Sequence, residues 1–106
     1  MSALGEIFAE LQRRANANPE RLQGLSAVYQ FELTGEGGGT YHVRIADGQA
    51  AVVEGPAQDA GCTIQMEAAD FQALVAGRLN PMTAFMTGKL KVRGDLSLAM
   101  KLQSLL

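Results

Sequence analysis

The chain has 106 residues and a formal net charge of −2 at pH 7; 47% of its residues are hydrophobic and 19% are charged. This length and composition predict one folded domain spanning residues 1–106 and exclude a disordered chain. The negative balance excludes a general electrostatic attraction to nucleic acid, and no apolar run approaches the roughly 20 residues of a membrane-spanning helix. A single cysteine, Cys62, and the lack of a signal-peptide core lead us to expect a cytoplasmic protein.

The first quarter of the chain predicts a helix followed by a strand. Apolar residues at helical spacing predict a helix over about 3–16, with Ser2 as its N-cap. Pro19 prevents the helix from continuing. The spacing of apolar residues then changes to every second position, which predicts a half-buried strand over 25–34.

Three further strands are predicted over 40–46, 49–54 and 61–67. Asp47-Gly48 predicts a type I′ hairpin turn, because that turn needs positive φ at both central residues. We expect the first four strands to form an antiparallel sheet through local turns, with one solvated and one buried face.

The last part of the chain returns to helical spacing. Helices are predicted over 68–76 and 81–87, the second capped by Asn80. A fifth strand follows over 89–93, and Asp95 caps a final helix. This order predicts an α+β fold, with helices packed on one face of a five-stranded, mostly antiparallel sheet.

The final predicted helix is apolar on more than one face. At 100° per residue, its hydrophobic side chains cover well over half of the circumference, although a surface helix needs only a stripe of roughly 100°. Gln103 lies inside this apolar arc, where its amide needs a partner. Either a backbone group or a polar group of a bound ligand would satisfy it.

Charge is unevenly distributed along the chain. Residues 1–77 hold ten acidic and four basic residues, whereas residues 78–106 hold five basic residues and only Asp95. The ordinary interpretation is a set of solvated lysines and arginines. The functional interpretation is a weakly basic face that makes transient contact with an anionic membrane surface.

The stretch "LNPMTAFMTGKLKVRGDLSLAMKLQSLL", residues 79–106, resembles the C-terminal signature of the sterol carrier protein 2 family, and "CTIQMEAADFQALVAGRLNP" upstream extends the likeness. The resemblance implies an SCP-2-like fold in which sheet and helices enclose an apolar tunnel. Family members bind sterols, fatty acids, acyl-coenzyme A esters or phospholipids there, as lipid carriers or as domains attached to enzymes. The ending Ser104-Leu105-Leu106 lacks the central basic residue of a peroxisomal signal, so we do not expect peroxisomal import.

The candidate ligand-binding residues are the apolar side chains of the predicted helices, several of them methionines that adapt to ligands of different shape. Composition alone favours a packed core made of these residues, whereas the resemblance favours a tunnel lining. They are Phe71, Leu74, Val75, Met82, Phe85, Met86, Leu98, Met100, Leu102 and Leu105, together with Gln103.

Catalysis has little support in the sequence. His42 shares a strand face with polar residues and is expected to point to solvent, while Cys62 lies on an apolar face, where a thiol is inert. These two residues cannot supply the four ligands of a structural zinc site. The glycines of residues 35–39 do not have the spacing of a dinucleotide loop. We expect no cofactor and no bound metal.

The leading hypothesis is therefore a non-enzymatic carrier of a lipid-like small molecule, as a monomer or weak homodimer that binds no nucleic acid. In a second interpretation the core is fully packed and the apolar C-terminal helix docks on another copy or on a partner protein. A third, an enzyme acting on acyl esters, requires Cys62 and His42 to meet.

Overall fold

The computed structural model describes residues 3–105, and side chains from Leu4 to Leu102; the predicted N-cap Ser2 lies outside this range. In chain order the elements are α1 (Ala3–Ala17), the short 3-10 helix η1 (Pro19–Arg21), β1 (Ala27–Thr34), β2 (Gly39–Ala46), β3 (Gln49–Glu54), β4 (Cys62–Glu67), α2 (Ala68–Val75), α3 (Pro81–Met86), β5 (Lys91–Gly94) and α4 (Leu96–Leu105). The predicted α+β class and the order of elements are confirmed.

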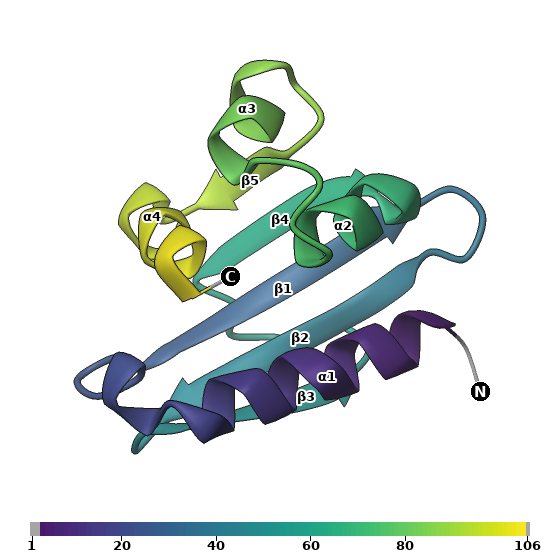
Figure 1. Ribbon diagram of the computed structural model, residues 1–106. Coiled ribbons are helices and arrows are strands. Elements are labelled where there is room, and N and C mark those ends of the chain that lie inside the picture. Colours follow the sequence, from purple (N-terminus) through teal and green to yellow (C-terminus); the bar gives the residue numbers. More distant parts are fainter. Residues whose placement is uncertain (1–2, 106) are drawn as a thin grey trace.

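The five strands form one sheet in the order β3-β2-β1-β4-β5 (Figure 1). Three of the pairings are antiparallel, but β1 and β4 run parallel, with Tyr29 opposite Cys62 and Leu33 opposite Met66. The prediction that the first four strands form an antiparallel sheet through local turns was therefore wrong at β4.

The physical reason lies in the segment 55–61, which carries the chain from the β3 edge past β2 and β1. A parallel neighbour requires a crossover of this kind, whereas a hairpin turn would have left β4 next to β3. The segment is held against the sheet by hydrogen bonds from the Ala57 amide to the Gln30 side chain (2.9 Å) and from the Gly61 amide to the Val28 carbonyl (3.0 Å).

Helices α1, α2 and α4 lie on one face of the sheet, and the core fills the space between (Figure 1). The alternating burial of β1 and β4 places every second side chain in this core, as period-two patterning predicts. Four aromatic rings form its centre: Phe8 lies 4.4 Å from Tyr41, 5.1 Å from Phe71 and 5.4 Å from Phe31 between ring centroids. Such contacts contribute about 0.5–1.5 kcal/mol each beyond area burial.

Helix α1 also covers the exposed edge of the sheet. The Asn16 side chain accepts from the Ala50 amide (2.8 Å) and donates to the Ala50 carbonyl (3.0 Å), while the side-chain Oε1 of Gln12 accepts from the Val52 amide (2.8 Å). These side chains replace the neighbouring strand that β3 lacks. An edge strand with satisfied backbone groups does not offer a template for pairing with another chain.

The opposite face of the sheet is polar and partly covered by the segment 55–61. His42 was expected to point to solvent, but it is only 6% exposed, and its Nδ1 lies 2.8 Å from the Gly55 carbonyl oxygen. The prediction was wrong because strand alternation gives the face of a side chain but not what folds over that face. Arg44 forms a bidentate ion pair with Asp59 on the same segment, with nitrogen–oxygen distances of 2.8 and 3.0 Å.

Glu32 is the centre of a second polar cluster on this face. Its carboxylate accepts hydrogen bonds from Gln65 (2.7 Å), Gln30 (2.8 Å) and Arg93 (3.1 Å). The amide donors of Gln65 and Gln30, followed by the charge of Arg93, lower the pKa of Glu32. The cluster therefore ties β1, β4 and β5 together by their side chains.

Candidate functional site

An apolar groove lies at the β5 edge of the sheet and is lined by residues of β4, α3, β5 and α4. Figure 1 shows α3, β5 and α4 gathered beside β4 at this edge. Its volume is about 270 Å³. The described residues that line it are all apolar: Ile64, Pro81, Met82, Phe85, Leu90, Val92, Leu96, Ala99, Met100 and Leu102. An apolar concavity of this kind accepts a hydrocarbon group. None of its described lining residues offers a polar side chain for catalysis.

Local signals in the sequence position the α3 wall of the groove. The Asn80 side chain accepts from the amides of Met82 (2.8 Å) and Thr83 (3.3 Å), which starts α3, as predicted. Gly88, with φ +80°, ends the helix, and the Leu90 amide then bonds back to the Ala84 carbonyl at 3.0 Å. This return places Leu90 and Val92 against the groove.

The α4 wall is attached through a tight junction with the start of β4. The Asp95 amide donates to the Gly61 carbonyl (2.9 Å), and the Asp95 carboxylate caps α4 by accepting from the Ser97 amide (2.9 Å). A Cβ at Gly94 would lie only 2.5 Å from the Gly61 carbonyl oxygen, and φ at Gly94 is +98°. Glycine is therefore required at this corner.

A buried tyrosine provides a second attachment for α4. Tyr29 is fully buried, and its hydroxyl donates to the Leu98 carbonyl at 2.6 Å. Burial, with smaller contributions from Cys62 and Asp95, raises the pKa of Tyr29 to about 12. The phenol therefore stays neutral and keeps its donor proton at physiological pH.

The rim of the groove is exposed although it is apolar. Met82, Phe85, Leu96 and Met100 line the groove and are 49–72% exposed. A side chain that only filled a core would be buried, as those around Phe8 are. The groove is therefore open to solvent along its rim.

The predicted ligand-binding residues fall into several places. Those that line the groove are Met82, Phe85, Met100 and Leu102. Phe71 and Leu74 are buried in the core, Leu98 packs against it, and Val75 faces α1. Met86 is exposed outside the lining, and the side chains of Gln103 and Leu105 lie outside the described residues. The ligand role of each of these residues stays a prediction.

The sequence analysis missed more than half of the groove lining. The missed residues are Ile64, Pro81, Leu90, Val92, Leu96 and Ala99. In the strand predicted over 89–93, period-two alternation places Leu90 and Val92 on the same side, and this signal could have found them. Ile64 becomes part of the wall only because β4 lies between β1 and β5.

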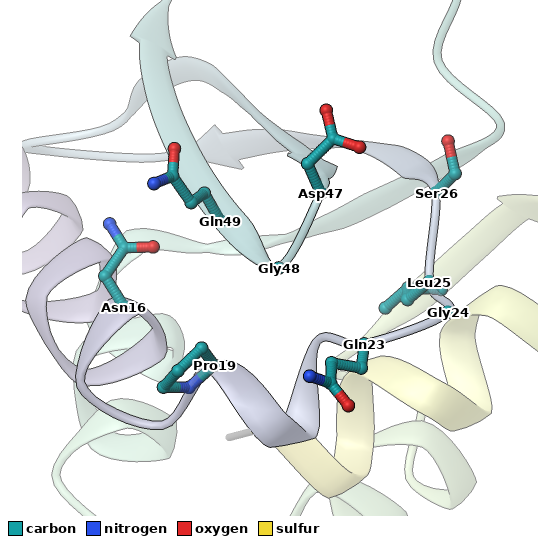
Figure 2. Close-up of a pocket in the computed structure, with 9 residues that line it drawn as sticks. All are labelled: Asn16, Pro19, Gln23, Gly24, Leu25, Ser26, Asp47, Gly48 and Gln49. Atoms are coloured by element: carbon teal, nitrogen blue, oxygen red, sulfur yellow. The ribbon is translucent and has the colours of Figure 1, made fainter.

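Two other hollows differ in chemistry. The larger, about 660 Å³, lies between the end of α1 and the β2–β3 turn, and its lining is polar and apolar in equal parts (Figure 2). Its Asn16 already bonds to Ala50, and Asp47 is its single charged side chain. This hollow does not match an apolar ligand.

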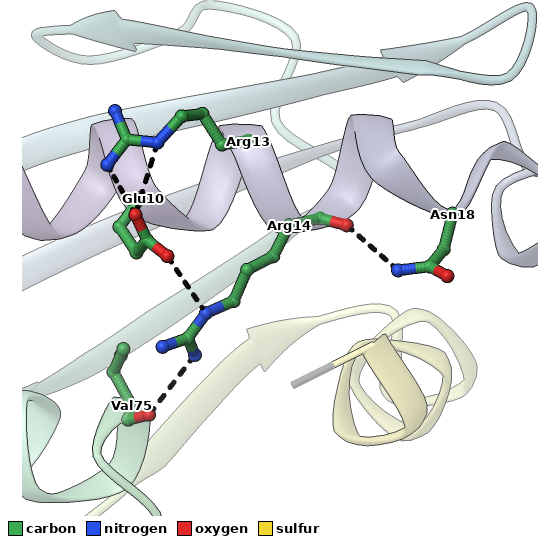
Figure 3. Close-up of polar contacts among 5 residues, drawn as sticks. All are labelled: Glu10, Arg13, Arg14, Asn18 and Val75. Carbon is green, nitrogen blue, oxygen red and sulfur yellow. Dashed lines mark hydrogen bonds and ion pairs between the residues drawn. The ribbon is translucent and has the colours of Figure 1, made fainter.

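The third hollow, about 280 Å³, lies between α1, η1 and α2. Its Arg14 pairs with Glu10 (3.4 Å) and reaches the Val75 carbonyl at 3.5 Å, while Arg13 also pairs with Glu10 (Figure 3). Mainly the hydrogen bond from Arg13 lowers the pKa of Glu10. The positive charge of Arg14 is thus partly compensated by the neighbouring Glu10 carboxylate.

The residues that a catalytic interpretation requires do not meet. Cys62 is buried on the helix-covered face of the sheet, where burial raises the pKa of its thiol. His42 lies on the opposite face and on β2, with β1 between the two strands.

Among residues 3–105, no three His, Cys, Asp or Glu side chains gather as a metal site would require. No described helix has the length and apolar character needed to cross a membrane.

Comparison with known proteins assigns the fold. A model of the SCP-2 sterol transfer family matches residues 8–106. Hydroxysteroid dehydrogenase-like protein 2 of Xenopus laevis is 36% identical over 99% of the chain, and human sterol carrier protein 2 is 35% identical over 93% of it. The chain spans only 25% and 19% of those two proteins. The solution structure of palmitated SCP2L2 from Aedes aegypti matches with a TM-score of 0.82 at 24% identity, over 98% of this chain and 93% of that one.

Proposed function

Since the chain belongs to the SCP-2 sterol transfer family, a family of lipid-binding and lipid-transfer domains, we propose that it carries a single-chain acyl lipid in the groove between α3, β5 and α4. The observation that carries this proposal is the groove itself, whose described lining residues are all apolar and whose rim is exposed. The domain is generally non-enzymatic, and we propose no reaction for it.

The volume of the groove favours an acyl chain over a sterol. A methylene group takes roughly the 30 Å³ that a water molecule occupies in the liquid, so about 270 Å³ holds about nine of them. A sixteen-carbon acyl chain also exceeds this space, but it is flexible and can extend past the open rim, whereas the fused rings of a sterol form one rigid block. That the Aedes aegypti neighbour was solved in palmitated form supports palmitate as the first probe.

The energetics set a limit on binding to the groove as it stands. About nine methylenes at about 0.8 kcal/mol each give about 7 kcal/mol of gross stabilisation. Association takes back at least about 4 kcal/mol, which leaves only weak binding. We therefore propose that a long chain is accommodated by outward movement of α4, which Tyr29 and the Gly61–Asp95 junction attach at its N-terminal end.

A substitution that fills the groove tests the proposal. Ala99→Leu adds three carbon atoms at a lining position, which corresponds to about 2.4 kcal/mol of displaced methylenes. We expect palmitate affinity, measured by native mass spectrometry and by displacement of a fluorescent fatty acid, to fall at least tenfold. Ala69→Leu, at an exposed position of α2 outside the groove, is the matched control.

The same experiment has two outcomes that reject parts of the proposal. Equal affinity of the Ala99→Leu and Ala69→Leu proteins would place the ligand elsewhere. Stoichiometric uptake of cholesterol in preference to palmitate would reject the acyl-chain assignment. Absence of any uptake would favour the interaction-module interpretation, in which the apolar rim docks on a protein.

A further inference from the structure

We propose that Met82 and Met100 form a peroxide-sensitive modification site, at which oxidation to methionine sulfoxide makes the walls of the groove polar and lowers its affinity for an acyl chain. The modification is reversible, because methionine sulfoxide is reduced back to methionine by dedicated reductases. The inference rests on the proposed function for the identity of the ligand, whereas the oxidation itself is measured without any ligand.

The methionines of the chain differ widely in exposure. Among residues 4–102, the side chain of Met66 is buried, with 4% exposed. Those of Met82, Met86 and Met100 are 50%, 79% and 72% exposed. All three belong to α3 and α4, and two of them, Met82 and Met100, line the groove from opposite walls. The sulfur atoms most accessible to an oxidant therefore lie at the opening of the proposed ligand site.

The modification is a transfer of one oxygen atom from hydrogen peroxide to the thioether. A lone pair of Sδ attacks one peroxide oxygen, and the O–O bond breaks. The second oxygen takes up the proton of the first and leaves as water, so the sulfur loses the two electrons that the peroxide gains. The product is a polar, chiral sulfoxide in place of a flexible apolar side chain.

The location of these two sulfur atoms determines the effect on the ligand. Because the described lining residues are all apolar, none of their side chains can donate to a sulfoxide oxygen once a bound acyl chain excludes water. A polar group that loses water without gaining a partner opposes binding, so we expect palmitate affinity to fall roughly tenfold. Met86 lies outside the lining, and its sulfoxide would stay in water in the loaded protein.

The single cysteine does not compete for the oxidant. Cys62 is 1% exposed, and burial raises the pKa of its thiol, so that little of the reactive thiolate is present at neutral pH. Met66 is buried in the same core. Among the sulfur atoms that the structure describes, those of α3 and α4 are therefore expected to react first.

Limited treatment of the full chain with hydrogen peroxide, followed by peptide mass mapping, tests the site. We expect one added oxygen atom at Met82, Met86 and Met100 well before Met66. Palmitate affinity, measured by native mass spectrometry, should fall roughly tenfold on treatment. Prior loading with palmitate should slow the oxidation of Met82 and Met100 but not that of Met86, because the acyl chain covers only the groove. Oxidation of Met66 as fast as that of Met82 would overturn the inference.

Substitution by leucine separates the groove walls from exposed methionine in general. Leucine has nearly the same volume as methionine and no oxidisable sulfur. Each variant is compared with itself before and after peroxide, so an effect of the substitution alone cancels. The double variant Met82→Leu with Met100→Leu should lose the response to peroxide. Met86→Leu is the matched control and should keep the full response, although Met86 is the most exposed of the three. The opposite pattern in either variant would overturn the inference.

A dye that binds apolar surface, anilinonaphthalene sulfonate, keeps the two proposals distinguishable. Loss of dye binding on oxidation, in a protein that takes up no palmitate, would reject the proposed ligand and retain the modification site. Unchanged dye binding in such a protein would reject both. Palmitate uptake unaffected by full oxidation of Met82 and Met100 would retain the ligand and overturn the modification site. Loss of the circular dichroism signal on oxidation would also overturn it, since the lower affinity would then come from unfolding.

Discussion

Tyr29→Phe removes a buried side-chain hydrogen bond that ties the middle of the sheet to α4. The substitution deletes the 2.6 Å hydrogen bond to the Leu98 carbonyl and keeps the aromatic ring in the core. A hydrogen bond of this kind contributes about 0.5–1.5 kcal/mol net. We therefore expect the free energy of unfolding to fall by about 1 kcal/mol, which lowers Tm by about 4 °C for a domain of this size.

Tyr29→Phe should weaken the attachment of α4 more than it lowers the stability of the whole domain. Amide hydrogen exchange in α4 should accelerate about fivefold at 1 kcal/mol, while exchange in β2 changes only through global unfolding. Tyr41→Phe is the matched control, because Tyr41 is also a buried strand tyrosine and no hydrogen bond of its hydroxyl is found among the described residues. If α4 exchanges at the same rate in both variants, Tyr29 does not hold α4 and the reasoning fails.

The pH dependence of the stability difference between the unaltered protein and Tyr29→Phe provides a second test. The pKa of Tyr29 is raised to about 12 in the folded chain, against about 10 for a tyrosine in the unfolded chain. Between these values the unfolded state binds fewer protons, so the stability contributed by Tyr29 is present below pH 10 and is lost as the pH rises towards 12. The stability difference between the unaltered protein and Tyr29→Phe should therefore narrow from pH 9 to pH 12.

Two further predictions concern the edge and the polar face of the sheet. Asn16→Ala removes both hydrogen bonds to Ala50. It should lower the free energy of unfolding by about 1–2 kcal/mol in a urea titration and accelerate exchange of the Ala50 amide. The control Asn18→Ala loses one exposed hydrogen bond to the Arg14 carbonyl and should lower the free energy of unfolding by less. Glu32→Gln should lower stability at neutral pH. Because the folded-state pKa of Glu32 is lowered, its contribution is present above its unfolded pKa and is lost as the pH falls through the folded value, so the two proteins should converge in urea titrations towards pH 3. A constant gap at acidic pH would contradict this role of the carboxylate.

Local signals in the sequence predicted most of the elements. The Asp47-Gly48 turn has φ of 55° and 74°, and Asn80 and Asp95 cap the helices that follow them, as predicted. These features depend on a few neighbouring residues, so a single sequence reveals them. Period-two alternation likewise indicated which side of β1 and β4 is buried.

Features that depend on distant segments were not accessible in this way. The segment 55–61 has no periodicity, so neither the parallel pairing of β4 with β1 nor the burial of His42 could be predicted from it. The lining of the groove also depends on distant segments and could not be predicted from local patterns alone. Helical spacing predicted that Phe71 and Met100 are both apolar contact residues, but only the packed structure distinguishes the buried ring from the exposed rim.

The parallel pairing of β1 with β4 has a consequence for the order of folding. The β2–β3 hairpin joins neighbouring residues, whereas the β1–β4 ladder joins Tyr29 to Cys62 across more than thirty residues. Loop closure must precede such long-range contacts, so we expect β4, β5 and α4 to assemble after the first three strands. The elements that close the groove are then the last to fold and the first to detach in partial unfolding. We therefore expect release of the proposed acyl ligand and the earliest step of unfolding to follow the same motion of α4.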